Sequence, residues 1–309
     1  MKILIRFDSL EIRIKDMVFC IVTVAFIIST MLFNTSAMAE NIKVKRGEHK
    51  PLLLGIFPRR SAKNTVRMFM PLADYLSKKL GRQVKLVIAR DFKKFWEGVT
   101  HNRYDIVHYN QYHYVRSHKN HGYNVIAVNE EFGSDTISGT LVVRRDSNIN
   151  SVEELKGKLI VFGGGPKAMQ SYIIATYLLR QAGLKPGDYT YRFTKTPPNS
   201  IFAPYYKQAD AGGVGDTVLK LPTITRKIDT RKLKILARNE PLAQLPWAIK
   251  GRMDSKLAKR IQFIMLSMNQ TKDGKKVLAK AILTGFKIIH DHDFNKHRHI
   301  IKIVLGEEY

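Results

Sequence analysis

Three short segments of the chain combine residues that could bind an anion. The first, Phe162 to Lys167 (FGGGPK), follows an apolar run and precedes a helical pattern. Glycines allow a tight turn, and proline is favoured at the first position of a helix. The free N–H groups of such a helix start attract anions. We therefore predict ligand contacts from Gly164, Gly165, Lys167 and Ala168, with a plain tight turn as the alternative. The lysine-serine or lysine-threonine pair of a nucleotide-binding loop is absent.

The second segment is the string His108 to Tyr114 (HYNQYHY), which directly follows the apolar run at 105–109. Open α/β sheets bind ligands at the carboxyl ends of their parallel strands. Tyr109 and Asn110 come first after the strand, and we predict that both face a binding cleft. Tyr114 is predicted to pack under the following helix.

The third segment, Phe57 to Ser61 (FPRRS), also lies between a predicted strand and a predicted helix. Arg59 or Arg60 could hold an oxyanion with the fork of N–H donors of its guanidinium group. The alternative is that both arginines are simply solvated on a very basic protein. We include Arg59 among the predicted ligand contacts.

Catalytic and metal-binding patterns are weak. The chain has neither a GxSxG nor an HExxH motif, and capping explains Asp105, Asp210 and Asp216 better than acid–base chemistry does. A transition metal could be held by two His-x-His pairs near the end of the sequence, namely His290, His292, His297 and His299. A basic tail is the simpler interpretation, so we predict no metal, no cofactor and no enzymatic activity.

The segments that must position these residues alternate between strand and helix patterns, which predicts mainly parallel sheets covered by helices. Apolar runs predict strands at 52–57, 84–89, 105–109, 124–129, 139–145, 158–162, 191–194, 211–214 and 233–237. Helical spacing predicts helices at 64–80, 91–100, 111–119, 167–182, 199–208 and 254–268. Ser151 and Glu154 have the spacing of a capping box.

No flexible linker separates the α/β units near 50–138 and 146–230. Ordered strands near 139–145 and 233–239 are therefore predicted to connect them. We predict one lobe from residues 50–138 plus 240–309, and a second lobe from residues 139–239 that includes the crossover strands.

The first 39 residues have the form of a secretory signal peptide. An apolar run at 18–32 precedes Ala37-Met38-Ala39, and translation could begin at Met17 instead of Met1. Cleavage after Ala39 is favoured over an uncleaved anchor. The only cysteine, Cys20, lies in that run, so the mature chain would contain no thiol or disulfide.

The net charge of the whole chain is +26, and removal of residues 1–39 would leave +25. Such a field attracts anionic ligands or anionic surfaces. Export argues against nucleic acid as the partner. A solvated basic surface near anionic lipid is the alternative to steering of an anionic ligand.

Residues from about 50 to 285 resemble the phosphate/phosphite/phosphonate-binding proteins of ABC transporters, which have the type II periplasmic binding fold. The stretches that carry the resemblance are LLLGIFPRRS, FMPLADYLSKKLG, DIVHYNQYHYV, RRDSNINSVEELKGKLIVF and QADAGGVGDTVL. The resemblance implies two lobes joined by two crossover strands, with the solute clamped between them. It also implies a cleft lined by Phe57, Tyr109, Asn110, the 163–170 loop and Asn199.

One departure from the family concerns the ligand. The phosphonate binders carry Ser-Thr-Ser-Gly at the start of the second-lobe helix, where this chain has Lys167-Ala168-Met169-Gln170. The resemblance as a whole implies a periplasmic protein, expected to be monomeric, that captures a small anion resembling phosphonate or phosphate for a membrane ABC permease, and the missing hydroxyls count against a phosphonyl ligand. A larger or less charged solute, or a carboxylate, is an alternative ligand. A signalling role with a sensor kinase and an exported enzyme are the alternative functions.

Overall fold

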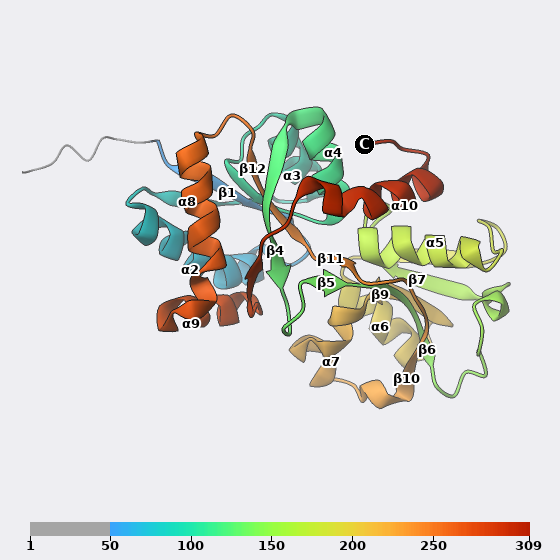
Figure 1. Cartoon of the computed structure of the whole chain (residues 1–309). Helices are drawn as coiled ribbons and strands as arrows, with labels where there is room; N and C mark the ends of the chain where they lie inside the picture. The colour runs from blue at the N-terminus through green and yellow to red at the C-terminus, as the bar shows by residue number, and fades with distance from the viewer. Residues whose placement is uncertain (1–49) are drawn as a thin grey trace, which may run out of the picture. The chain divides into compact units, whose positions relative to one another are not determined.

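The computed structural model describes residues 50–309, and the predicted signal peptide lies outside these residues. Pro51–Tyr309 form one compact unit. Within the described part of the chain, no helix combines the length and the apolar character needed to cross a membrane. Two large sheets and a two-stranded pair organise this unit (Figure 1).

The first sheet has six strands in the order β13-β4-β12-β3-β1-β2. Strands β1, β2, β3 and β4 point in the same direction, whereas β12 and β13 are antiparallel to their neighbours. The strand bounds are β1 Leu52–Ile56, β2 Val84–Ile88, β3 Ile106–His108, β4 Tyr123–Glu130, β12 Pro246–Lys250 and β13 Gly285–Lys287.

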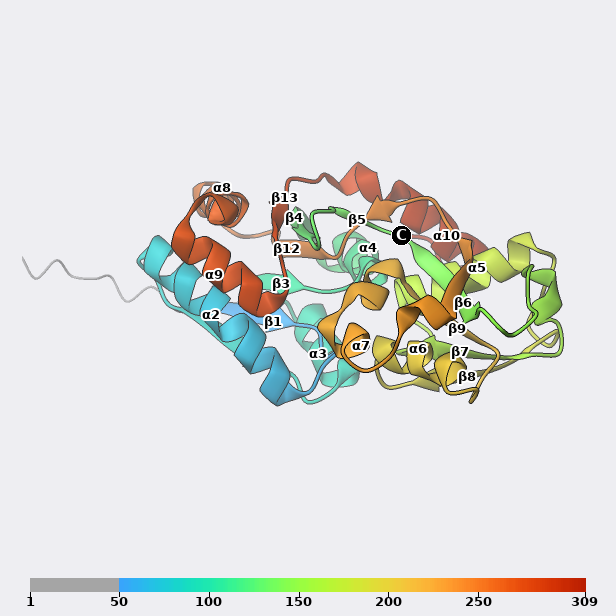
Figure 2. The ribbon, with the colours of Figure 1, turned by 90° about the horizontal axis from the view of Figure 1, so that it is seen from below.

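Helices cover both faces of this sheet because successive side chains of a strand point to opposite faces. Ile106 of β3 packs in the cluster formed with α2, α8 and α9, whereas Val107 packs in the cluster formed with α3 and α4 (Figures 1 and 2). The helices are α2 Ala62–Leu80, α3 Phe92–Thr100, α4 Gln111–His121, α8 Ser255–Leu266 and α9 Lys272–Ala281.

The second sheet has five strands in the order β10-β6-β9-β7-β8, and only β6 runs against the others. Leu141 packs towards α5, and Val142 packs on the opposite face with Ile201 of α6. The elements are β6 Gly139–Arg144, β7 Leu159–Gly163, β8 Thr190–Thr194, β9 Ala211–Gly215, β10 Leu233–Arg238, α5 Ile174–Gln181, α6 Pro197–Tyr205 and α7 Pro222–Thr225.

The chain passes twice between the two sheets. Strands β5 (Thr136–Ile137) and β11 (Leu242–Ala243) pair antiparallel at these crossings. The segments that the sequence indicated as connections, 139–145 and 233–239, pair with each other as β6 and β10 inside the second sheet. We propose that the two sheets are the cores of two lobes, with residues 139–239 forming the second lobe.

Helix α10 (Asn295–Leu305) contacts both α4, beside the first sheet, and α5, beside the second sheet. The Arg180 guanidinium of α5 donates hydrogen bonds to the Ile303 and Val304 carbonyl oxygens of α10. Helix α10 therefore gives the lobes a further connection besides the crossings (Figure 1).

Two helix predictions are wrong in detail. The capping box at Ser151 gives only a 3-10 turn, Glu153–Leu155, without a side-chain cap, and Gly157 at φ +74° ends it. The helix predicted at 167–182 begins at Met169, with a π-helical turn (Met169–Ile173) before α5. Pro166 is therefore not the first helical residue.

Candidate functional site

A cavity of about 290 Å³ lies where strands of both sheets end. Ligand pockets in proteins usually measure about 300–1,000 Å³, so this one suits a small solute. Its walls come from residues that follow the carboxyl ends of β1, β3, β7 and β9, which is the usual ligand position in open α/β sheets. The lining residues are Phe57, Arg59, Phe92, Asn110, Gln111, His113, Ile137, Gly163–Ser171, Lys195, Pro197, Gly215, Thr217, Val218 and Leu245.

The second-lobe wall, residues Gly163–Ser171, presents mainly backbone. Gly164 has φ +98° and donates its N–H group to the Thr194 carbonyl oxygen. The Ala168 N–H group donates to the Gly165 carbonyl oxygen, which closes a turn and delays the helix start to Met169. Within residues 50–309, the N–H groups of Met169, Gln170 and Ser171 find no acceptor. These three donors at the positive end of a helix can hold an oxyanion.

Close backbone packing fixes this wall. A Cβ atom on Gly213 of β9 would lie 2.3 Å from the Ser171 carbonyl oxygen, and one on Gly163 would lie 2.5 Å from the Pro197 Cα atom. Only glycine allows such approaches. The Ser171 hydroxyl donates to the Gly163 carbonyl oxygen, so it already has a partner within the wall.

The first-lobe wall, formed by Phe57, Arg59, Phe92, Asn110, Gln111 and His113, presents side chains that are mostly tied to other groups. Asn110 caps α4, because its Oδ1 atom accepts a hydrogen bond from the His113 N–H group at 3.0 Å. Its Nδ2 atom donates to the Lys167 carbonyl oxygen at 3.0 Å, which links the two walls. Asn110 thus lines the cavity as predicted, but its amide is already paired.

Arg59 brings a largely buried positive charge to the cavity. Its side chain is 21% exposed, its Nη2 atom lies 3.7 Å from Glu131 Oε1, and its guanidinium carbon lies 5.1 Å from the Phe57 ring centroid. The Arg59 Nε atom is buried and has no hydrogen-bond partner among residues 50–309. Burial lowers the pKa of Arg59, and burial together with the Arg59 charge lowers the pKa of Arg60 to about 9. Arg59 pairs with the Glu131 carboxylate, and Arg60 adds a second positive charge nearby, so an added anion would offset the remaining charge.

Lys167 lines the cavity, but its ammonium group is paired with a residue outside the cavity lining. Its ammonium group pairs with the Glu307 carboxylate and lies 4.9 Å from the Tyr112 ring centroid. The Tyr112 hydroxyl also donates to Glu307, at 2.7 Å. Burial raises the pKa of Glu307, and the bonds from Lys167 and Tyr112 outweigh this effect, so its pKa is lowered overall.

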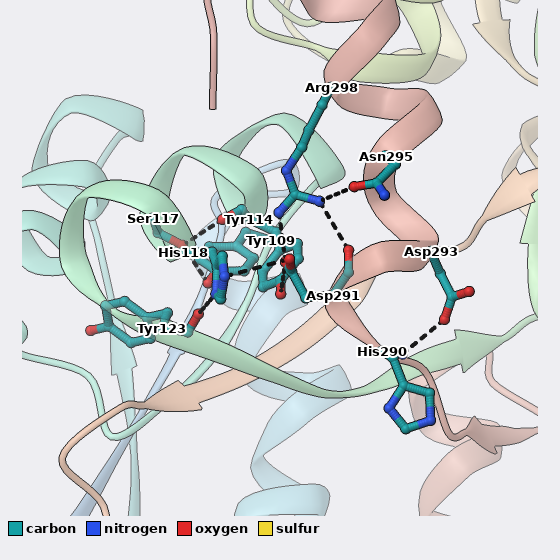
Figure 3. A network of polar contacts seen from close by, with 10 residues as sticks. All are labelled: Tyr109, Tyr114, Ser117, His118, Tyr123, His290, Asp291, Asp293, Asn295 and Arg298. Carbon is teal, nitrogen blue, oxygen red and sulfur yellow. Dashed lines mark hydrogen bonds and ion pairs between the residues drawn. The ribbon is translucent and has the colours of Figure 1, made fainter.

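Tyr109 does not line the cavity. The residue is fully buried, and its hydroxyl lies 2.6 Å from the Ser117 hydroxyl in α4 (Figure 3). The prediction that Tyr109 faces the cleft is wrong because strand alternation directs its side chain to the face covered by α4. Tyr114 packs in the same region, and its hydroxyl donates to Asp291, which also pairs with Arg298.

Asn199 is also absent from the lining. It lies exposed in the first turn of α6, and Pro197 of the same turn reaches the cavity instead. The other predicted residues, Phe57, Arg59, Asn110, Gly164, Gly165, Lys167 and Ala168, meet at the cavity.

Several lining residues were missed by sequence reasoning. Gln111 and His113 belong to the HYNQYHY string and fall in the first turn of the helix predicted at 111–119, but they were not named as ligand contacts. Phe92, Lys195 and Leu245 carry no local signal, because they reach the cavity only through the packing of separate elements. His113 also touches Trp96 of α3, with 5.3 Å between ring centroids.

The lining of the cavity contains no aspartate, glutamate or cysteine. Across residues 50–309, no group of three or more histidine, cysteine or acidic side chains could hold a metal ion. The His290 ring stacks with the His292 ring, while the His297 ring is buried. The N–H groups of Met169, Gln170 and Ser171 and the Arg59 guanidinium are donors that can bind a small anion.

The comparison with known families assigns the chain. Residues 54–294 match the model of the family described as "ABC transporter, phosphonate, periplasmic substrate-binding protein". The chain belongs to this family. It is therefore a solute-binding component of an ABC transporter and not an enzyme, and its fold is that of the type II periplasmic binding proteins.

Individual relatives are distant. The phosphonates-binding periplasmic protein of Escherichia coli (strain K12) is 22% identical over 274 residues, which cover 87% of this chain and 80% of that protein. The binding protein of a Pseudomonas aeruginosa ABC phosphonate transporter has a TM-score of 0.70 at 18% identity, with 82% of this chain and 87% of that one covered. A Prochlorococcus marinus structure in complex with methylphosphonate has a TM-score of 0.71 at 18% identity, with 82% and 98% covered. These structural likenesses support the fold.

Proposed function

We propose that this phosphonate-family protein binds a small phosphonate-like oxyanion in the cavity. The unpaired N–H groups of Met169, Gln170 and Ser171 are the observation that carries the proposal. They point to hydrogen bonds with the oxygen atoms of the ligand, and the Arg59 guanidinium supplies the opposite charge. Phe57, Phe92 and Leu245 would contact the organic part of the ligand.

Lobe closure is the mechanism that this arrangement supports. The second-lobe wall donates hydrogen bonds to the anion, and the first-lobe wall supplies charge and apolar contact. A ligand that touches both walls stabilises the closed form over the open form by its differential affinity. The closed form would be the one that the membrane permease recognises.

The experiment is a calorimetric titration of the purified protein with methylphosphonate, phosphate, sulfate and acetate. We expect saturable binding of methylphosphonate or phosphate. At a ligand concentration of one hundred times the dissociation constant, the free energy of unfolding should rise by about 2.7 kcal/mol. Binding of acetate alone would contradict the proposal, because the site would then be a carboxylate site.

We further propose that the chain acts as a periplasmic monomer after cleavage following Ala39, and that its partner is a permease and not a sensor kinase. The mass of the protein recovered from the periplasm tests the cleavage site. Light scattering tests the monomer, and ligand uptake by cells lacking the chain tests the partner. Normal uptake with lost gene induction would instead favour the sensor kinase.

A further inference from the structure

Besides its N–H donors, the cavity carries buried hydrogen-bond acceptors that an oxyanion cannot use. Gln111 is fully buried, and its Nε2 atom donates to the Ala243 carbonyl oxygen at 2.8 Å. That bond orients the amide, so its oxygen is the free atom. Among residues 50–309, Gln111 Oε1 has no hydrogen-bond partner, and an unpaired buried polar atom is destabilising.

His113 supplies a second acceptor through the orientation of Asn110. The Asn110 Nδ2 atom donates to a carbonyl oxygen, so Oδ1 is the atom that faces the His113 N–H group and the His113 Nδ1 atom, the latter at 2.8 Å. Nδ1 must then carry a hydrogen. Burial, and then the charges of Arg116 and Lys167, lower the pKa of His113 to about 3, so the ring is neutral. Its Nε2 atom is therefore a bare acceptor.

Gln170 provides the third acceptor, on the opposite wall. The residue is 8% exposed and lines the cavity, and in the described part of the chain neither of its amide atoms has a hydrogen-bond partner. One of these atoms is a donor and the other an acceptor, whichever way the amide is turned. Both walls thus offer neutral acceptors, and the lining includes no carboxylate.

The positive charge of the cavity lining decides which kind of hydrogen-bond donor on the ligand suits these acceptors. The cavity is lined by Arg59, Lys167 and Lys195, all cationic. An ammonium group on the ligand would lie among these charges without a carboxylate to pair with, and a buried unpaired charge is strongly disfavoured. A hydroxyl or amide N–H group on the ligand can donate to such an acceptor without burying an unpaired charge.

On the basis of the proposed function, we infer that the oxyanion ligand carries an uncharged hydrogen-bond donor, a hydroxyl or an amide N–H group, that donates to one of the three acceptors on Gln170, Gln111 and His113. Gln170 is the specificity residue whose side chain has no other partner. Ligands with an ammonium group at the same place are rejected.

Three phosphonates that differ in one heavy atom test this inference. Hydroxymethylphosphonate, ethylphosphonate and aminomethylphosphonate are titrated separately by calorimetry at constant pH. We expect hydroxymethylphosphonate to bind at least about tenfold more tightly than either of the others. Equal affinities for the hydroxy and ethyl compounds would mean that water satisfies the acceptors, which overturns this inference and leaves the proposed function standing. Tightest binding of aminomethylphosphonate also overturns it. Failure of all three to bind, while methylphosphonate or phosphate binds, overturns this inference alone, whereas failure of methylphosphonate and phosphate as well overturns the proposed function with it.

A variant at Gln170 tests whether this residue causes the preference for hydroxymethylphosphonate. Gln170→Met keeps the length of the side chain and removes no hydrogen bond within the protein, so the fold should be preserved. We expect the preference for hydroxymethylphosphonate over ethylphosphonate to fall at least threefold, whereas the control Gln181→Met, at an exposed position of α5, should leave it unchanged. An unchanged preference in Gln170→Met would overturn the role of Gln170.

Discussion

The two walls of the cavity differ in how far their polar groups are hydrogen-bonded within the protein. On the first-lobe wall, Asn110 and His113 bond to each other and Arg59 pairs with Glu131, so that single atoms such as Arg59 Nε and Gln111 Oε1 are left unpaired. On the second-lobe wall, by contrast, the N–H groups of Met169, Gln170 and Ser171 and the whole Gln170 amide find no partner within residues 50–309. Polar groups that are hydrogen-bonded within the protein fix the shape of the wall, whereas unpaired polar groups can bind a ligand that enters the cavity. The comparison indicates that the first wall mainly sets charge and shape, and the second wall holds the anion.

The largest effect should come from disturbing the second wall through the packing beneath it. Gly213→Ala places a Cβ atom 2.3 Å from the Ser171 carbonyl oxygen, which must shift the unpaired N–H groups. We expect a loss of about 1–3 kcal/mol in the free energy of unfolding, measured with urea, and loss of anion binding. Gly165→Ala, where a Cβ atom meets nothing within 4 Å, should keep normal stability. Normal binding by Gly213→Ala would show that the position of these N–H groups does not matter.

Removing the charge of the first wall should have the next largest effect. Arg59→Met deletes the buried cation and leaves Glu131, whose side chain is 8% exposed, without its guanidinium partner. A charged hydrogen bond contributes about 1.5–3 kcal/mol, so anion affinity should fall roughly 10- to 100-fold. Arg90→Met, at a side chain that is 79% exposed, is the control and should bind normally. Full affinity in Arg59→Met would leave binding entirely to the second wall.

The free energy of unfolding should depend on pH because His113, a residue of the first wall, is buried and neutral. The pKa of His113 is about 3 in the folded chain and near 6.5 when unfolded, so the unfolded state gains protons first as the pH falls. The stability present above pH 6.5 is therefore lost on acidification, by about 2 kcal/mol between pH 7 and pH 5 for this group. His113→Phe should be less stable at pH 7 but show a shallower pH dependence of urea unfolding. The exposed control His299→Gln should keep the original dependence.

The smallest effect should come from Lys167, although it lies on the anion-binding wall. Its ammonium group pairs with Glu307, and the two side chains are 37% and 30% exposed. Pairs with this exposure contribute about 0–1 kcal/mol, so Lys167→Ala should change anion affinity less than about tenfold. A larger loss would mean that this charge reaches the ligand. Comparing Glu307→Gln with the double variant Lys167→Ala/Glu307→Gln would then separate the contact of Lys167 with the ligand from its pairing with Glu307.

Sequence patterns predicted the sheets and most of the cavity because strand ends are local features. Gly164, Asn110 and Arg59 each follow an apolar run, and the carboxyl ends of such runs meet at one edge of a sheet. The same reasoning failed for Tyr109, whose direction depends on which face of β3 is covered by α4. It also missed the pair β5–β11 at the crossings between the sheets, since two-residue strands carry no periodicity.

The pairing of Lys167 with Glu307 could not be predicted either. These residues are far apart in the sequence, and only the packing of α10 against α5 brings them together. The free amide of Gln170 is a similar case, because its state depends on the absence of neighbours in three dimensions and not on residue type.

The contact between Trp96 and His113 gives the native chain an intrinsic optical probe. The chain has only two tryptophans, and Trp247 is buried against His108, away from the cavity lining. Trp96 touches a residue of the cavity wall and also lies under the Arg116 guanidinium. A ligand that bonds to His113 should therefore alter indole fluorescence, and Trp96→Phe should abolish that signal while Trp247 continues to emit. Solute capture could then be followed in real time without attaching a dye.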